Sequence, residues 1–327
     1  MEMIDVDLAA TTARATARPG VRLSPRQARA EVAGLHAAAK TSVETVQQLT
    51  GLDVARGLDD SQVLVLDRPG WARSTATGLV EMTRPGFEAV QARNPLYTSR
   101  IFAGASRATA SVQLGTVLGY LSTRILGQYD PFVPGPAGGG RLALVAPNTA
   151  MIRGELDLDP VDFRLWVCLH EQTHRVQFAA APWLAEYLQQ AVTSLLVMMT
   201  DPDQALNGRD AIKAQMSTVN GVMSLLEGHA NVVMDAVSTS LVPTKHTIRR
   251  RFNDRKPPGG PLGALFRKLI GMDAKAAQYR NGQQFVQAVV AQIGMDGFNR
   301  VFTDARYMPT EAELHDATAW IARTEAL

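Results

Sequence analysis

Two histidines that could hold a metal ion lie four residues apart in the stretch RLWVCLHEQTHRVQFAA, residues 164–180. His170 and His174 are about one helical turn apart, so both imidazoles can project from one face of a helix toward one ion. Glu171 directly follows the first histidine and could take a proton from a water molecule on that ion. The pattern H-E-x-x-H therefore predicts a catalytic zinc (Zn2+) site whose third ligand lies elsewhere in the chain.

The competing interpretation is a buried helix that carries two hydrogen-bonded histidines. The local sequence favours the metal site, because the helix has a strong start: Asp159 is suited to the N-cap and Pro160 to the first helical position. The apolar face of this helix continues into the two histidines. Glu171 would also be a poor core residue without a chemical role.

The third ligand decides the subclass of zinc site. The metzincin extension requires a glycine and a third histidine after the motif, but Gln177 and Ala180 occupy those positions, so that subclass is excluded. An acidic ligand on a later helix is the alternative. The segment STVNGVMSLLEGHANVVMDAVS, residues 217–238, is predicted to be a buried helix and carries both Glu227 and His229.

Glu227 and His229 are two positions apart, so their side chains point nearly opposite ways on a helix and are not expected to bind the same ion. We favour Glu227 because Asn231, one turn later, could hydrogen-bond to a metal ligand. The neighbours of His229 are apolar. A hydrolase also needs a donor that stabilises the developing oxyanion. The candidates are His229, which we place first because it is near Glu227, and Tyr279 and Tyr307.

Five segments carry a resemblance that extends well beyond the motif: PNTA, DPVDFRLWVCLHEQTHRVQFAAAPWL, LSTRILGQYDPF, LLEGHANVVMDAV and QYRNGQQFVQAVV. Together they resemble the zincin-like metallopeptidase type 2 family, mostly actinobacterial proteins described as hydrolases or as associated with biosynthesis of a deazaflavin coenzyme. The resemblance runs in order from about Leu64 to Arg323. It implies a predominantly α-helical α+β zincin-like fold with a small β-sheet. It also implies zinc bound by His170, His174 and Glu227, with Glu171 as the base.

Composition limits the class of protein. The formal net charge of +2 in 327 residues gives no field of one sign that would favour nucleic acid or an anionic membrane. Cys168 is the single cysteine, which excludes an internal disulfide and fits a reducing compartment. The first residues lack the pattern of a signal peptide. The longest apolar run, residues 183–200, is interrupted by polar residues and is expected to be a buried helix. We therefore expect a cytoplasmic globular protein.

The chain is expected to divide at a Pro/Gly-rich loop, residues 134–140. Residues 1–23 are predicted to be a flexible N-terminus, 24–133 a helical N-terminal lobe, and 141–327 the catalytic lobe, unless the two lobes form one continuous domain. A helix should begin at Ser24, and Gly115 and Gly119 indicate close helix packing.

Two short β-strands are predicted within this plan. The first begins at Gln62 and should end in a turn at Pro69-Gly70. The second, residues 142–146, should end in a turn at Pro147-Asn148.

The densest basic run lies in TKHTIRRRFNDRKPPGG, residues 244–260. It could bind an acidic substrate, a peptide carboxylate or nucleic acid, or it could be a solvated, mobile segment. We favour the second interpretation, because aromatic residues for base stacking are missing apart from Phe252. Nucleic acid is therefore an unlikely partner.

The sequence as a whole predicts a zinc-dependent hydrolase, most plausibly a peptidase that cleaves an amide bond in a peptide or other amide substrate. The alternative is a zincin-fold protein that keeps its metal for binding or structure and has lost activity. Glu171 favours the enzyme, because an inactive descendant would be free to lose it. Neither the substrate nor the oligomeric state follows from these residues.

Overall fold

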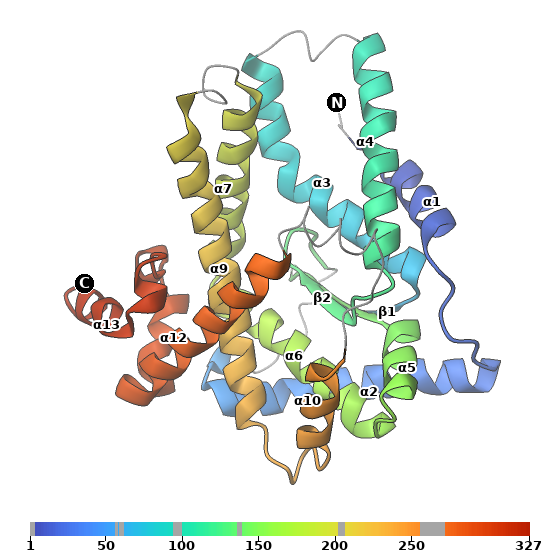
Figure 1. The fold of residues 1–327 in the computed structure, drawn as a ribbon, viewed down its shortest axis with the longest axis vertical. Coiled ribbons are helices and arrows are strands. Elements are labelled where there is room, and N and C mark those ends of the chain that lie inside the picture. The colour runs from blue at the N-terminus through green and yellow to red at the C-terminus, as the bar shows by residue number, and fades with distance from the viewer. Residues whose placement is uncertain are drawn as a thin grey trace.

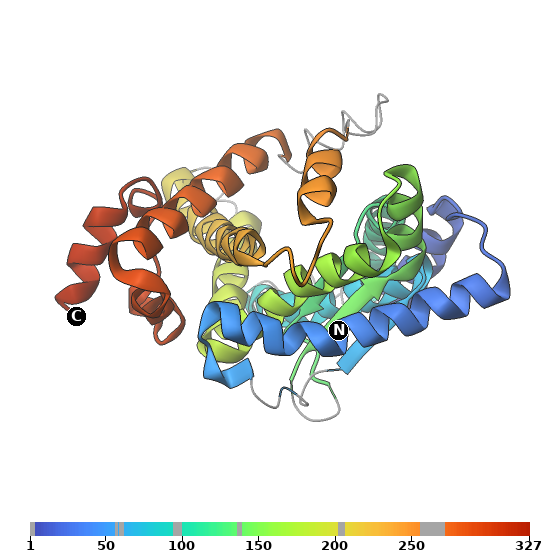
Figure 2. The same ribbon diagram turned by 90° about the horizontal axis from the view of Figure 1, so that it is seen from below.

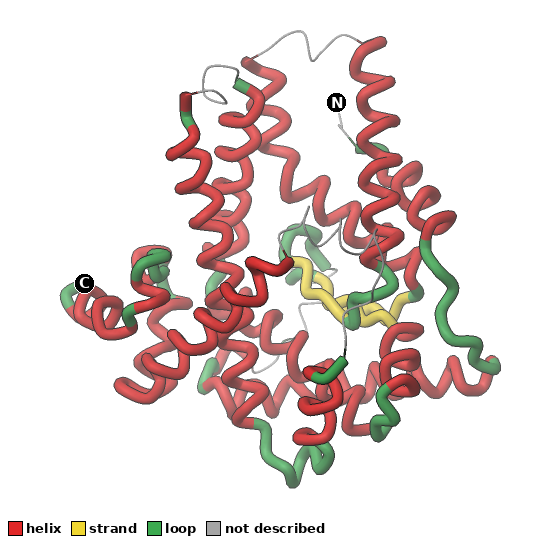
Figure 3. Tube along the Cα trace, viewed as in Figure 1, coloured by secondary structure: helices red, strands yellow, loops and turns green. Residues whose placement is uncertain are grey.

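The computed structural model describes residues 4–55, 58, 62–93, 100–135, 139–201, 207–255 and 272–327, with side chains except at 100–105 and 272–280. Helices predominate around one short sheet (Figures 1 and 3), as the sequence predicted. No described helix combines the length and the apolar character needed to cross a bilayer. The helices are α1 (Val6–Thr16), α2 (Pro25–Thr50), η1 (Asp53–Ala55), α3 (Arg68–Arg93), α4 (Arg100–Leu121), α5 (Ala146–Glu155), α6 (Pro160–Ala180), α7 (Trp183–Thr200), α9 (Arg209–Ala236), α10 (Lys245–Asn253), α12 (Met272–Phe298), η3 (Asn299–Phe302), η4 (Ala305–Tyr307), η5 (Glu313–His315) and α13 (Ala317–Glu325).

The sheet contains β1 (Gln62–Leu66), β2 (Gly127–Asp130) and β3 (Arg141–Val145), in the order β1-β3-β2. The central strand β3 pairs in parallel with β1 and antiparallel with β2. Its apolar residues are buried, whereas β2 forms an edge of the sheet beside α6. Strands from both sides of the loop at residues 134–140 therefore share one sheet.

The helix that carries the two histidines, α6, begins where the sequence predicted. Asp159 caps it by accepting hydrogen bonds from the backbone N–H groups of Val161 and Asp162, both at 2.9 Å. Below α6 lies the long helix α2 (Figures 1 and 2), and the two helices share a core that includes the fully buried Phe163 and Cys168. Cys168 is thus a small core residue, as expected.

The helix that carries Glu227, α9, packs against α7 and α12 around a second apolar core. Its crossing with α12 is so close that a Cβ on Gly228 would clash with the backbone of Gly282. A Cβ on Gly282 would in turn clash with the backbone of Ser224. Glycines at this crossing allow backbone-to-backbone contact, and this contact fixes the part of α9 next to Glu227.

The turns predicted at Pro69-Gly70 and Pro147-Asn148 are wrong, because both prolines lie in the first turn of a helix. The strand β1 ends at Leu66, and α3 begins at Arg68. Likewise α5 begins directly after β3. Proline is tolerated there because the first backbone N–H groups of a helix have no helical acceptor.

The segment expected to be flexible, residues 1–23, contains the regular helix α1, so that prediction is wrong for Val6–Thr16. Asp5 caps this helix, and its three inward-facing alanines, at positions 9, 10 and 13, are buried. Alanines carry little hydrophobic signal in a sequence, but they allow another helix to come very close. That helix is α4: a Cβ on Gly115 or Gly119 would clash with α1. The close packing predicted at these glycines is therefore confirmed.

The basic run between residues 245 and 255 is packed on the protein, so the expectation of a solvated segment is wrong there; Lys256 lies outside the described residues. Helix α10 buries Ile248. Its start is tied to α6, because Asp162 accepts hydrogen bonds from Thr244 N and Oγ1 at 2.7 and 2.6 Å. Arg249 pairs with Asp235. The observed packing differs from the prediction because basic side chains of this run have partners in the folded protein, which the sequence did not reveal.

We predict that Gly115→Val destabilises the protein by about 1–3 kcal/mol, because the new side chain would overpack the contact between α4 and α1. Chemical denaturation measures the change in the free energy of unfolding. Thr116→Val, on the exposed face of the same helix, is the matched control and should have little effect. Equal stability of the two variants would contradict the close contact.

Candidate metal centre

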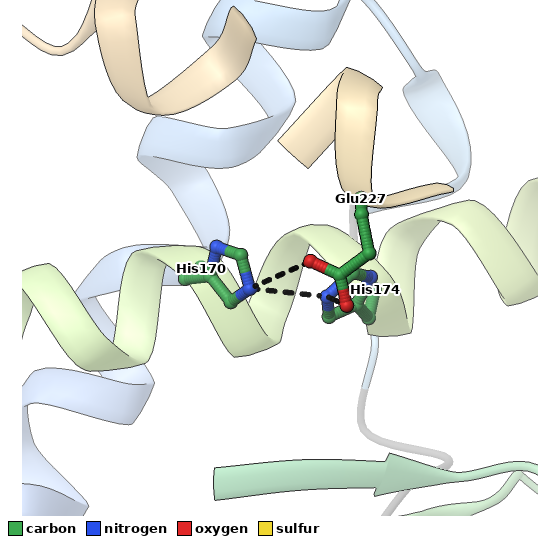
Figure 4. Close-up of side chains that lie close together, drawn as sticks. All are labelled: His170, His174 and Glu227. Carbon is green, nitrogen blue, oxygen red and sulfur yellow. Dashed lines mark hydrogen bonds and ion pairs between the residues drawn. The ribbon is translucent and has the colours of Figure 1, made fainter. Parts of the chain in front are cut away.

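Three side chains from two helices bring their donor atoms together (Figure 4). His170 and His174 project from α6, and Glu227 reaches them from α9. The two Nε2 atoms are 3.2 Å apart. The carboxylate oxygens of Glu227 lie 3.6 Å from His170 Nε2 and 3.7 Å from His174 Nε2. The structure thus brings together the three residues that the sequence singled out as ligands.

The spacing of these donors fits a tetrahedral zinc ion. With metal–ligand bonds of about 2.0–2.2 Å, neighbouring ligand atoms in such a site lie ~3.3–3.6 Å apart. The two nitrogens are 3.2 Å apart, and they lie 3.6 and 3.7 Å from different oxygens of Glu227, which is close to this range. One donor atom from each of the three residues gives a set that lies within 4.8 Å. Each of the three side chains also stays partly exposed, between 14% and 29%. A fourth ligand position therefore has access to solvent.

Gln177 orients one of the two histidines. Its Oε1 lies 2.9 Å from His174 Nδ1, so it can accept the ring N–H and leave the Nε2 lone pair directed at Glu227. Its Nε2 donates to Leu226 O at 2.9 Å and thereby joins α6 to α9. This role of Gln177 was not predicted from the sequence. Its position three residues after a histidine on a helix is the signal that could have revealed this role.

Burial keeps His170 neutral. Removal from solvent, followed by the neighbouring His174, lowers the pKa of His170 to about 4, and Glu227 opposes the shift. The imidazole is therefore unprotonated near neutral pH. Only that form has the lone pair that binds a metal ion.

Glu171 lies between α6 and the edge strand β2, with 8% of its surface exposed. Burial, followed by the charge of Glu227, raises the pKa of Glu171 to about 8. A carboxyl group that exchanges a proton near neutral pH is suited to general acid–base chemistry. Space for it depends on Gly127, because a Cβ there would lie 2.5 Å from Glu171 Cγ.

A cavity of about 1060 Å³ opens beside these residues. His170 and Glu171 form part of its wall, and Gly127 brings the edge strand to it. Its volume is at the upper end of the range for small-molecule sites. The rest of the described wall mixes charged and polar groups with apolar ones: Arg124, Ile125, Leu126, Trp166, Val167, Asn231, Met234, Arg249, Phe252, Asn253 and Gln283.

His229 is not among the residues that line the described wall of this cavity, so its expected role as a donor to the oxyanion stays a prediction. Its ring is fully buried and stacks on Phe298 at 5.2 Å between centroids. Its Nδ1 lies 2.9 Å from Gln177 Nε2. Tyr307 is not among the residues that line the cavity, and the side chain of Tyr279 lies outside the described part of the chain. Asn231, one turn after Glu227, does line it.

Comparisons with known proteins identify a similar structure and a family. The chain resembles a crystal structure from Chloroflexus aurantiacus described as a candidate hydrolase with a novel fold. The TM-score is 0.71 and the identity 29%, and the match covers 99% of each chain. Among curated proteins, none matches the chain significantly. The model of the zincin-like metallopeptidase family matches residues 4–321. Because this match spans nearly the whole sequence, the chain belongs to the zincin-like metallopeptidase family.

Proposed function

We propose that this protein is a zinc-dependent hydrolase that cleaves an amide bond in a peptide. The observation that carries the proposal is the cluster of His170, His174 and Glu227, with a partly open side toward a cavity. Its two nitrogens are 3.2 Å apart and lie 3.6 and 3.7 Å from the two carboxylate oxygens. Structural zinc sites usually have four protein ligands, whereas catalytic sites have three and an open position. Among the described residues, the candidate ligands are three: His170, His174 and Glu227.

A zinc ion at these ligands would polarise a substrate carbonyl and make a water molecule a stronger nucleophile at neutral pH. Glu171 lines the same cavity, so its carboxylate can take the proton of the attacking water and then give it to the leaving nitrogen. Gln177 holds His174 in the orientation that the metal requires. The partly buried surroundings strengthen each of these electrostatic interactions.

The edge strand β2 supports an extended peptide as the substrate. Val145 N donates to Leu126 O at 2.8 Å, so residues 126 and 145 form a hydrogen-bonded pair. Along antiparallel strands such pairs alternate with pairs that share no hydrogen bond. By this alternation, the backbone groups of Gly127 turn away from β3, at the cavity wall next to Glu171. A peptide in extended conformation could add to such an edge.

A metal-binding protein without activity is the alternative. Such a protein would need the three ligands but not Glu171, whose nearly complete burial is unfavourable for a carboxyl group without a chemical role. The family and the description of the similar crystal structure also support a hydrolase. We therefore favour the enzyme.

We predict that the purified protein binds about one zinc ion per chain and that His170→Ala or His174→Ala abolishes this binding, since two ligands cannot hold the ion tightly. Glu227→Gln should weaken binding, because a neutral amide is a poorer ligand than a carboxylate. Elemental analysis after dialysis measures the metal content. His36→Ala, at an exposed position on α2, is the control. Full zinc retention in both histidine variants of the motif would rule out the site.

We predict that Glu171→Gln keeps its zinc but loses about a hundredfold or more of the hydrolytic rate, because the amide cannot accept the proton. The measurement is cleavage of a peptide library followed by mass spectrometry, with metal content determined on the same samples. Glu186→Gln, an exposed change on α7, is the control. Cleavage at the wild-type rate by the Glu171 variant would disprove the mechanism.

We predict that Gln177→Leu lowers zinc affinity by about ten- to a hundredfold, because His174 loses the acceptor that fixes its ring. Gln177→Glu keeps an acceptor for His174 and should retain more of the affinity. Competition with a chromophoric chelator measures both values, and Gln190→Leu on the exposed side of α7 is the control. Unchanged affinity in folded Gln177→Leu would show that the hydrogen bond does not position the ligand.

A further inference from the structure

The two arginines that line the described wall of the cavity differ in their partners. Arg249 forms an ion pair with Asp235, and that carboxylate also accepts a hydrogen bond from Gln283 at 2.9 Å. For Arg124, the described part of the chain offers no carboxylate within ion-pair distance. Among the described residues, Arg249 is thus a neutralised cation in the cavity wall, whereas Arg124 is a cation without a counter-charge.

The guanidinium of Arg124 is nevertheless held in place. Its Nη1 donates to Tyr120 O at 3.1 Å and to Thr123 Oγ1 at 2.8 Å. The guanidinium carbon lies 3.6 Å from the centroid of the Tyr120 ring. These contacts use one nitrogen and one face of the group. The donors on Nε and Nη2 make no hydrogen bond to any described residue, and together they form the fork that binds a carboxylate in bidentate fashion.

The electrostatic surroundings of Arg124 also favour an anion. Burial lowers its pKa, and the positive charges of Arg18 and Arg255 act in the same direction, opposed by Tyr120. A guanidinium stays ionised despite such shifts, so Arg124 keeps a positive charge that no described carboxylate contacts, whereas Arg255 pairs with Glu155 at 2.9 Å. A carboxylate bound there would replace lost hydration and offset the repulsion between the arginines.

Arg124 is close to the candidate catalytic group. Three residues of chain span at most ~11 Å, and Gly127, three residues after Arg124, lies against Glu171. This upper limit on the separation of the two backbone positions is about the length of three residues of an extended substrate. The described cavity wall also includes apolar side chains, among them Trp166 and Phe252.

We propose that Arg124 is a specificity-determining residue that binds a carboxylate of the substrate within a few residues of the scissile amide. The substrates would be short peptides or acyl amino acids that combine an apolar side chain with this carboxylate. The carboxylate could be the C-terminus of a peptide or an acidic side chain. This proposal rests on the proposed function, because it concerns the substrate of the same site.

A purely structural role for Arg124 predicts a different outcome. The hydrogen bonds of its Nη1 lie at the end of α4, shortly before β2. Loss of the side chain could therefore destabilise the connection between the two elements. Stability would then change, but a preference between carboxylate and amide ligands would not. The selectivity for carboxylates separates the two roles.

The experiment measures the binding of three probes to the zinc-loaded Glu171→Gln protein, which binds without turnover. The probes are N-acetyl-Phe-Leu with a free carboxylate, its C-terminal amide, and N-acetyl-Phe-Glu amide. Calorimetry gives their affinities. We expect at least one carboxylate probe to bind about tenfold or more tightly than the neutral amide, since a bidentate charged pair makes that difference.

Arg124→Gln in the same protein should remove the preference, and Arg124→Lys should keep only part of it, because lysine retains the charge but not the fork. Arg73→Gln, at an exposed position away from the cavity lining, should leave it unchanged. Unfolding midpoints identify any variant that is misfolded; in that case Arg124→Lys provides the test. Equal binding of all probes, no binding at millimolar concentration, or a preference that survives in Arg124→Gln would each overturn the proposal.

The failure of this proposal is distinguishable from failure of the proposed function. Binding selectivity is measured without catalysis, so it can persist in a protein that cleaves nothing. Loss of hydrolysis with selectivity intact would count against the enzyme alone. Hydrolysis that depends on Glu171 but ignores the carboxylate would count against Arg124 alone.

Discussion

The close approach of three electron-rich donor atoms on two helices is the constraint on which the structure around the site depends. Such atoms repel one another unless a proton or a metal cation lies between them, so the fold must hold them together. The contact between α9 and α12 at Gly228 and Gly282 fixes one helix, and the core beneath α6 fixes the other. Gln177 bridges the two helices through Leu226 O and turns His174 toward the shared position.

The same packing determines the burial and the pKa of the neighbouring carboxyl group, Glu171. Because Glu171 follows a ligand on α6, it must leave the helix toward the sheet, where Gly127 provides the necessary space. Burial at this place raises its pKa to about 8. The edge strand therefore has two roles: it accommodates the proposed base and places a backbone edge at the cavity wall.

The distribution of positive charge around the cavity follows from tertiary contacts. The basic run of α10 supplies Arg249 to the wall, but Asp235 neutralises it. Arg124 follows α4 and has no such partner among the described residues, although its own sequence context is unremarkable. The density of charge along the chain was therefore a poor guide to the charge that is available to a ligand.

Local rules explain what the sequence determined by itself. The cap of α6 and the spacing of its histidines depend on contacts within one helix, so periodicity and capping chemistry were sufficient. Tertiary structure decided the rest. The alanine-rich helix α1 is stabilised by its close contact with α4 at Gly115. His229 lies in an apolar core, where its ring stacks on Phe298. Such contacts join residues distant in the chain, and nothing in the local pattern records them.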